Sequence, residues 1–197
     1  MANVELSAAE MELMCNASII LTKNTIVEKV YLLLGNVLQH FQQNEICKKI
    51  TAEIQSAPPK ISKGENYEGL PWVMLDYPRY FKRNDVFAVR IFFWWGNFFS
   101  ITLQTKGKFK ERFQVSSNKL QVMNDWYLCC NEDEWQHHFR EDNYKHLSAF
   151  TKNEIEQLLF IKLAKKIPLN KWDEVEIFLK NAFDELMNAI STTQAMK

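Results

Sequence analysis

The sequence is short of glycine and has no excess of either charge, and each shortage excludes a class of function. With only five glycines it holds no glycine-rich loop, which argues against P-loop NTPases and Rossmann dinucleotide-binding folds. It also lacks the GxSxG motif of nucleophile elbows. Lysine plus arginine equals aspartate plus glutamate at 24 each, so no net field draws the chain to nucleic acid or to an anionic membrane.

Regular cysteine spacing and long apolar runs are missing too. The four cysteines include no CxxC pair, and the adjacent Cys129 and Cys130 are poorly placed to bridge each other. We therefore expect reduced thiols in a cytoplasmic protein. No apolar run reaches the roughly 18 residues of a membrane span, and the first twelve residues carry three glutamates where a signal peptide is positively charged. These features predict neither secretion nor insertion into a membrane.

Aromatic residues are abundant, at 13% of the chain, and they concentrate in residues 86–105. This stretch holds two strongly β-forming runs separated only by Gly96 and Asn97. Glycine adopts positive φ without steric cost, so Gly96 suits the first central position of a two-residue type II′ turn. That register places Arg90 opposite Leu103. We predict an antiparallel hairpin over 86–105, around which the rest of the chain is organised.

The segments around the hairpin predict a sheet region over 70–131. Residues 70–77 have the composition of a strand, and prolines near both ends favour a position at or near the sheet edge. Residues 126–130 form another short strand, whereas 57–69 have the composition of a polar loop with no apolar period. Asn131 can cap a brief helix that follows this last strand. We expect about four antiparallel strands in all.

Helices are predicted on both sides of this region, over 7–56 and over 151–190. Each set opens with a capping box, in which a serine or threonine and a glutamate three residues later satisfy the first amides of the helix. The strongest apolar periodicity of the chain lies at 24–42. In the second set, apolar residues four apart continue the helix that begins at Thr151 as far as Pro168.

The elements come in the order helices, strands, helices, with no alternating βαβ pattern and no internal repeat. This order is typical of an α+β fold. We predict a sheet of about four antiparallel strands, with the hairpin 86–105 at its centre and the N-terminal and C-terminal helices packed on it. A length of 197 residues fits a single α+β domain over 1–197, since domains commonly hold about 100–150 residues.

One polar residue is conspicuous in the predicted hairpin. Arg90 lies between Val89 and Ile91 in an otherwise apolar strand, and a guanidinium there needs an anion or an exposed position. The neighbouring strand offers Asp76, so the two form either a structural ion pair or the polar end of an aromatic pocket. The ligand-binding hypothesis comprises Trp72, Asp76, Tyr77, Arg79, Arg90 and Trp94. Its ligand would be a small apolar or anionic molecule.

Two other clusters invite a chemical interpretation. Cys129, Cys130, His137 and His138 are of the types that zinc prefers, but adjacent residues diverge on a strand or a helix. At most one cysteine and one histidine would face one site, and we predict no metal and no cofactor. Residues 106–119 combine basic and aromatic side chains, a pattern typical of single-strand binding. An acidic residue interrupts them and the net charge is zero, so nucleic acid is not the expected partner.

The function expected from these patterns is a non-enzymatic binding or assembly domain with an aromatic-rich sheet surface or pocket. The alternative is a small-molecule enzyme, hydrolase-like, with a polar site around Asp76 and Arg90. Helices on one face of an open sheet would leave the other face exposed, and contiguous exposed aromatics mark partner contacts. A protein partner, a second copy in a homodimer or an apolar ligand would then cover the set Phe87, Phe93, Trp95 and Phe98, or the opposite set.

Overall fold

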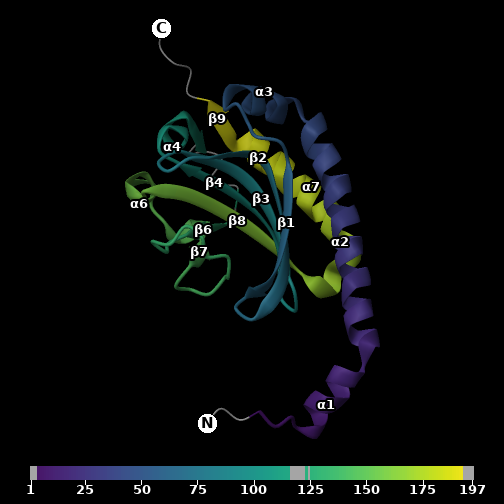
Figure 1. Ribbon diagram of the computed structural model, residues 1–197. Helices are drawn as coiled ribbons and strands as arrows, with labels where there is room; N and C mark the ends of the chain where they lie inside the picture. Colours follow the sequence, from purple (N-terminus) through teal and green to yellow (C-terminus); the bar gives the residue numbers. More distant parts are fainter. Residues whose placement is uncertain (1–3, 116–122, 124, 193–197) are drawn as a thin grey trace.

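The computed structural model describes residues 4–115, 123 and 125–192 (Figure 1). The first elements are α1 (Ala8–Cys15), α2 (Ala17–Gln43), α3 (Glu45–Glu53), β1 (Lys60–Tyr67), β2 (Leu70–Phe81), β3 (Val86–Trp94) and β4 (Phe98–Lys106). They are followed by α4 (Lys108–Arg112), β5 (Phe113–Val115), β6 (Tyr127–Cys129), β7 (Tyr144–His146), η1 (Leu147–Ala149), α6 (Lys152–Gln157), β8 (Phe160–Pro168), η2 (Leu169–Lys171), α7 (Trp172–Ala189) and β9 (Ile190–Thr192). The predicted α+β class is confirmed.

Seven strands form one antiparallel sheet in the order β1-β2-β3-β4-β8-β6-β7, and β5 pairs with β9 in a separate two-stranded sheet. The prediction of about four strands was therefore too low, and the main sheet extends beyond 70–131 in both directions. The predicted hairpin over 86–105 is confirmed, since β3 and β4 pair along their whole length near the centre of the sheet. β2 lies second from the edge, as its prolines favoured.

The long helices α2 and α7 lie side by side across one face of this sheet (Figure 1). α2 buries Val30, Leu34 and Phe41, and α7 buries Leu179 and Phe183. The rings of Phe41 and Phe183 stack with their centroids 3.5 Å apart. Since each fully buried large apolar side chain stabilises a fold by about 1.5–3 kcal/mol, these side chains fix both helices on the sheet.

The register of the central hairpin differs by one residue from the prediction. Arg90 pairs with Thr102 rather than Leu103, because residues 95–97 make a connection of three residues instead of two. Gly96 does adopt positive φ, at 73°. Because strand side chains alternate, the slip moves the polar residues of β4 onto the face of Arg90 and its apolar residues onto the face covered by helices.

The segment 57–69, predicted as a polar loop, contains strand β1. This strand pairs only with β2, and a tight turn at Glu68 and Gly69, with φ of 50° and 80°, joins the two. An edge strand with one face in solvent needs no apolar period. The absence of that period therefore did not identify a loop.

A strand also interrupts the helices predicted over 151–190. The capping box at Thr151 does start a helix, but α6 ends at Gln157 and β8 follows it, paired with β4 and β6. Leu163 and Ile167 are four residues apart, which puts them on one face of a strand as well as of a helix. Their spacing alone did not distinguish the two structures.

Residues 130–143, which we call the cover loop, lie over the face of the sheet that α2 and α7 leave free. The brief helix predicted after Asn131 is wrong. Asn131 Oδ1 accepts the Asp133 N–H at 2.8 Å and Asp133 Oδ1 accepts the Trp135 N–H at 2.9 Å, two turns that compete with a helix. The cover loop thus carries aromatic residues across the sheet without regular secondary structure.

Candidate functional site

Buried polar side chains lie between the sheet and the cover loop, centred on Asp76 and Arg90. These two residues are cross-strand partners in β2 and β3, with 10% and 8% of their side-chain surfaces exposed. Arg90 Nε donates to Asp76 Oδ1 at 2.7 Å and Arg90 Nη2 donates to Asp76 Oδ2 at 3.2 Å. The ring centroids of Phe81 and Trp135 lie 5.7 Å from the guanidinium carbon. The residues that the sequence pairs thus form a bidentate ion pair enclosed by aromatic rings.

The other residues of the ligand-binding hypothesis divide between two places. Trp72 and Trp94 lie on the face of Asp76, where both pack in one aromatic cluster, and Trp94 Nε1 donates to the Tyr67 carbonyl at 3.2 Å. Tyr77 lies on the opposite face and packs into the core under the helices. Arg79 Nε donates to the carbonyl of Pro58 at 2.7 Å, outside the cluster. Four of the six residues therefore lie on one face of the sheet, namely Trp72, Asp76, Arg90 and Trp94.

The aromatic face expected to be exposed is covered on both sides. Phe87 and Phe93 are enclosed by the helical layer, with 0% and 2% of their surfaces exposed, and Phe98 beneath the cover loop keeps 8%. Trp95, next to the turn, is half-buried. The premise of an open aromatic sheet surface was wrong, because the cover loop adds a third layer that the sequence pattern did not predict.

Lys162 is the buried cation that sequence analysis missed. It lies on β8 in a segment predicted as helix, and 1% of its surface is exposed. Its Nζ donates to the carbonyl of Glu134 at 2.8 Å and to the carbonyl of Gln136, both in the cover loop. Burial lowers the pKa of Lys162 to about 8. The amine thus joins the cover loop to the centre of the sheet.

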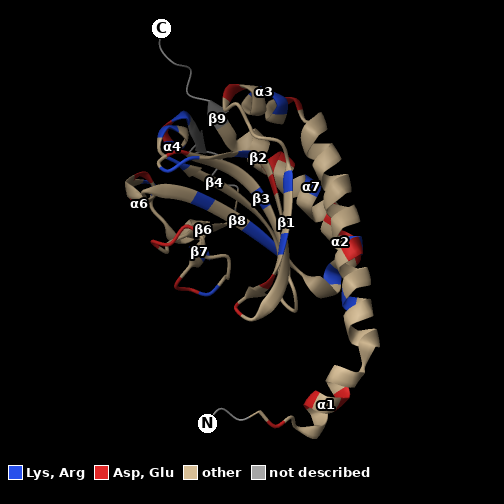
Figure 2. Cartoon of the chain, in the orientation of Figure 1, with Lys and Arg blue, Asp and Glu red and all other residues tan. Residues whose placement is uncertain are grey.

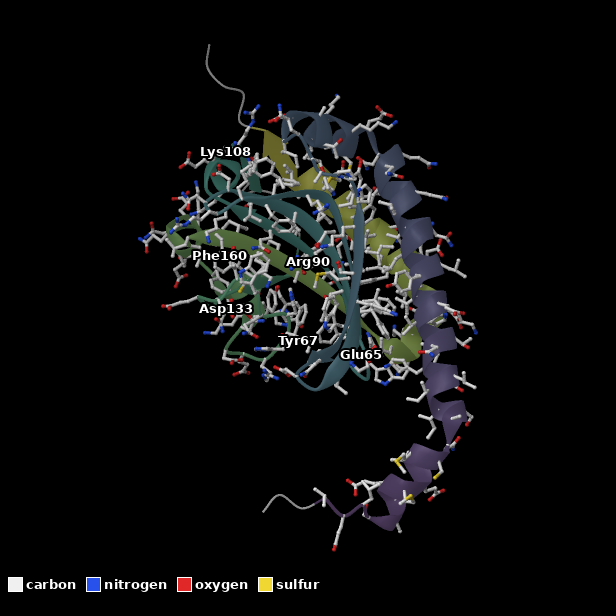
Figure 3. All side chains as sticks on the ribbon, in the orientation of Figure 1. Glu65, Tyr67, Arg90, Lys108, Asp133 and Phe160 are labelled. Atoms are coloured by element: carbon white, nitrogen blue, oxygen red, sulfur yellow. The ribbon has the colours of Figure 1, made fainter. Side chains whose placement is uncertain are left out.

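The hydroxyl of Tyr67 holds the same loop from the edge of the sheet. Its oxygen accepts the backbone N–H groups of His137 at 2.7 Å and of His138 at 3.1 Å. The His137 ring lies against Phe92, with centroids 4.8 Å apart. Burial, followed by the nearby charges of Lys162 and Arg90, sets the pKa of His137 well below its usual value. Figure 3 shows Tyr67 and Arg90 on the side of the sheet away from α2.

The cysteines and histidines of the zinc hypothesis do not converge. Cys129 Sγ lies 3.4 Å from Asn143 Oδ1, and burial raises the pKa of this thiol. His138 Nδ1 is buried without a hydrogen-bond partner, and Asp142 Oδ1 lies 3.9 Å from it. Within residues 4–115, 123 and 125–192, no group of three histidine, cysteine or acidic side chains could hold a metal ion.

The polar side chains of this face bind the cover loop of the same chain. Lys162 and Tyr67 bind the backbone of the cover loop from β8 and β1, and Gln104 Nε2 on β4 donates to Glu134 Oε2 at 2.7 Å. Lys106 Nζ reaches the other oxygen of Glu134 at 2.6 Å. Three strands thereby fix one loop, and the chemistry of this face is that of an internal docking surface.

A second region of the molecule has the opposite character. Residues 4–22, which we call the N-terminal arm, comprise α1 and the first turns of α2 and extend away from the sheet (Figure 1). The predicted capping box at Ser7 and Glu10 is formed, and α1 ends at Cys15 with Asn16 as its C-cap. Every residue of the arm is exposed. Its large apolar side chains are Val4, Leu6, Met11, Leu13, Met14, Ile19, Ile20 and Leu21, with 43–88% of their surfaces exposed.

An apolar groove of about 490 Å³ lies where the arm joins the body. It runs between α2, the turn after β3 and the start of α7, and its lining residues are Ile26, Lys29, Phe93, Trp95, Gly96, Leu169 and Trp172. Ile26 and Lys29 come from the same helix as the end of the arm. The groove and the arm are therefore neighbouring parts of one end of the molecule.

The N-terminal arm and the groove carry charges of opposite sign. The arm carries Glu5, Glu10 and Glu12 and no lysine or arginine, and Figure 2 shows acidic residues on α1. The groove has Lys29 in its lining, whereas Lys171, which lies between two lining residues of η2 and α7, pairs with Glu174 at 3.3 Å. An acidic apolar arm thus projects beside an apolar groove whose charged lining residue is Lys29.

No helix in the described ranges is long and apolar enough to cross a membrane. Searches of protein-family models, of curated proteins and of solved structures found nothing that matches this chain.

Proposed function

We propose that the protein is a binding and assembly module that holds a protein partner through its N-terminal arm. One observation carries this proposal: of the twelve large apolar side chains that are exposed in the described residues, eight belong to the arm. Large contiguous exposed apolar surfaces mark contacts with proteins, membranes or ligands, and no helix of the described residues could cross a membrane. The same arm contributes nothing to the core.

The aromatic face of the sheet is less suited to hold a partner. Its polar groups already bind the cover loop, so a partner at that face would first have to displace the bonds of Lys162 and Tyr67. A buried polar group left without a partner costs about 1–3 kcal/mol. The arm needs no such displacement, which supports it as the binding element.

A photo-crosslinking residue incorporated in the arm tests this function. Benzoyl-phenylalanine at position 13 and, separately, at position 20 should give adducts with the same polypeptide in the organism that makes the protein. Leu32 is the matched control, because it is 72% exposed but lies alone on the body of α2. Adducts no stronger at positions 13 and 20 than at position 32 would refute the proposal.

A further inference from the structure

We infer that the partner held by the arm is a second copy of this chain, each arm packing into the apolar groove of the other copy in a two-fold symmetric dimer. This inference rests on the proposed function, since it names what the arm binds. In a two-fold contact the same patch serves on both subunits, so one chain must supply both an insert and a receptor. The arm and the groove are such a pair.

The groove has the chemistry that the arm requires. Five of its seven lining residues have large apolar side chains, namely Ile26, Phe93, Trp95, Leu169 and Trp172. Its volume of about 490 Å³ falls within the range of about 300–1,000 Å³ of clefts that enclose a ligand. A helix in a groove inserts apolar side chains one turn apart, and α1 presents Met11 and Met14 at that spacing.

The charges of the two elements are complementary. Lys29 lines the groove and makes no ion pair with any acid of the described residues. Glu12 is exposed on the arm and likewise has no ion pair there. The arm's acidic charge therefore favours a groove lined by Lys29 and disfavours an anionic membrane surface.

The arm does not lie in the groove of its own chain. α2 is continuous from Ala17 and carries the arm away from Ile26, a groove residue. Every residue from 4 to 22 is exposed, so the groove of the same chain leaves the arm uncovered. The arm of a second copy can enter that groove while its own body stays outside it.

The arm also needs more than one surface against it. On α1, Glu10 and Glu12 lie about 160° apart at 100° per residue, so apolar residues fill both sectors between them. A helix with apolar residues on opposite sides is stable when it is enclosed. In the symmetric dimer one sector faces the groove of the second copy, and the other faces the first turns of that copy's α2.

Sedimentation equilibrium of the purified chain is the first test. We expect a dimer for the wild type, and a monomer with an unaltered denaturation midpoint for Leu13→Ser combined with Ile20→Ser. Leu32→Ser is the matched control and should remain dimeric. A monomeric wild type, or a dimer that survives both arm substitutions, would overturn the inference.

A charge exchange tests the orientation of the contact. Lys29→Glu and Glu12→Lys, each alone, should weaken dimerisation about fivefold or more, because each juxtaposes like charges. The double variant should recover most of the wild-type affinity. A double variant whose loss equals the sum of the two single losses would overturn the inference, because Lys29 and Glu12 would then not face each other.

The crosslinker at position 13 separates this inference from the proposed function. In a mixture of ¹⁴N and ¹⁵N chains, adducts between light and heavy chains that map to the peptides of Trp95 or Trp172 support the dimer. An adduct with a different polypeptide would refute the dimer and leave the proposed function standing. Co-sedimentation with neutral phospholipid vesicles, and no adduct with any chain, would refute both.

Discussion

The covered face of the sheet and the N-terminal arm are both rich in large apolar side chains, yet the chain covers only the first. The covered face holds polar groups such as Lys162 and Tyr67, each of which binds backbone atoms of the cover loop. Every residue of the arm is exposed, and none of its side chains belongs to the hydrophobic core. The difference shows that apolar area alone does not bring a loop onto a surface, and that a few buried hydrogen bonds fix where it lies.

The largest effect should come from breaking the ion pair beneath the cover loop. Arg90→Ala leaves the carboxylate of Asp76 buried without its cation, and we expect a loss of about 3–5 kcal/mol in the free energy of unfolding. Urea denaturation followed by tryptophan fluorescence measures it.

The exposed pair of Glu45 and Lys48 supplies the control for this experiment. Glu45→Ala should leave the urea midpoint unchanged, because exposed ion pairs add little to stability. Replacing both buried partners, with Asp76→Leu and Arg90→Met together, should recover much of the loss, since no buried charge then remains. A single Arg90→Ala variant as stable as the wild type would show that the pair is solvated.

The next effect concerns the attachment of the cover loop. Lys162→Met keeps an apolar stem of similar length but leaves the carbonyls of Glu134 and Gln136 without their donor. We expect a loss of about 1–3 kcal/mol and faster proteolytic cleavage within residues 130–143. Lys152→Met, at a lysine side chain 70% exposed on α6, is the control and should change neither measurement.

Acid should weaken the covered face through His137. Its folded-state pKa is depressed, so between pH 6.5 and that lower value the unfolded chain binds more protons and stability falls as the pH falls. The contribution reaches at most about 1.4 kcal/mol per pH unit. Denaturation of the wild type and of His137→Phe from pH 8 to pH 5 should show a difference that is constant above pH 7 and shifts below it. Parallel curves at all pH values would contradict this.

The smallest effect on stability should come from the arm. Leu13→Ser, measured at a dilution where the chain is monomeric, should change the free energy of unfolding by no more than about 0.5 kcal/mol, because the side chain is 59% exposed. Leu34→Ser, the same substitution at a fully buried position of α2, should cost about 3 kcal/mol or more. Equal losses would mean that the arm packs on its own body.

The sequence predicted best what depends on local pattern. The hairpin over 86–105 followed from two β-forming runs around Gly96, and the helix over 24–42 followed from its apolar period. The capping boxes at Ser7 and Thr151 start helices in the structure. The pairing of Asp76 with Arg90 followed from one cation in an apolar strand. These features need only neighbours in the chain or in the adjacent strand.

What the sequence did not predict depends on distant contacts. The hairpin register depended on whether the connection between the strands has two residues or three, and Gly96 is compatible with both lengths. Sequence analysis missed Lys162 because the apolar residues of its segment are four apart, a spacing that occurs on one face of a strand as well as of a helix. The exposure of the arm depends on how far α2 runs past the sheet. One indication of this exposure was present in the sequence. Glu10 and Glu12 lie on different sides of α1, so the helix has no one polar face opposite one apolar face.

The two edges of the sheet bear on how copies of this chain can meet. Strand β1 carries exposed Lys60 and Lys63 and an irregular register after Gly64, and β7, at the other edge, is three residues long with Lys145 exposed. Lysines, bulges and short strands all prevent a sheet from growing by adding a strand of another molecule. Association edge to edge, the route to fibrils, is thereby blocked at both ends. A surface made of a helix can then be apolar and exposed at little risk of uncontrolled polymerisation.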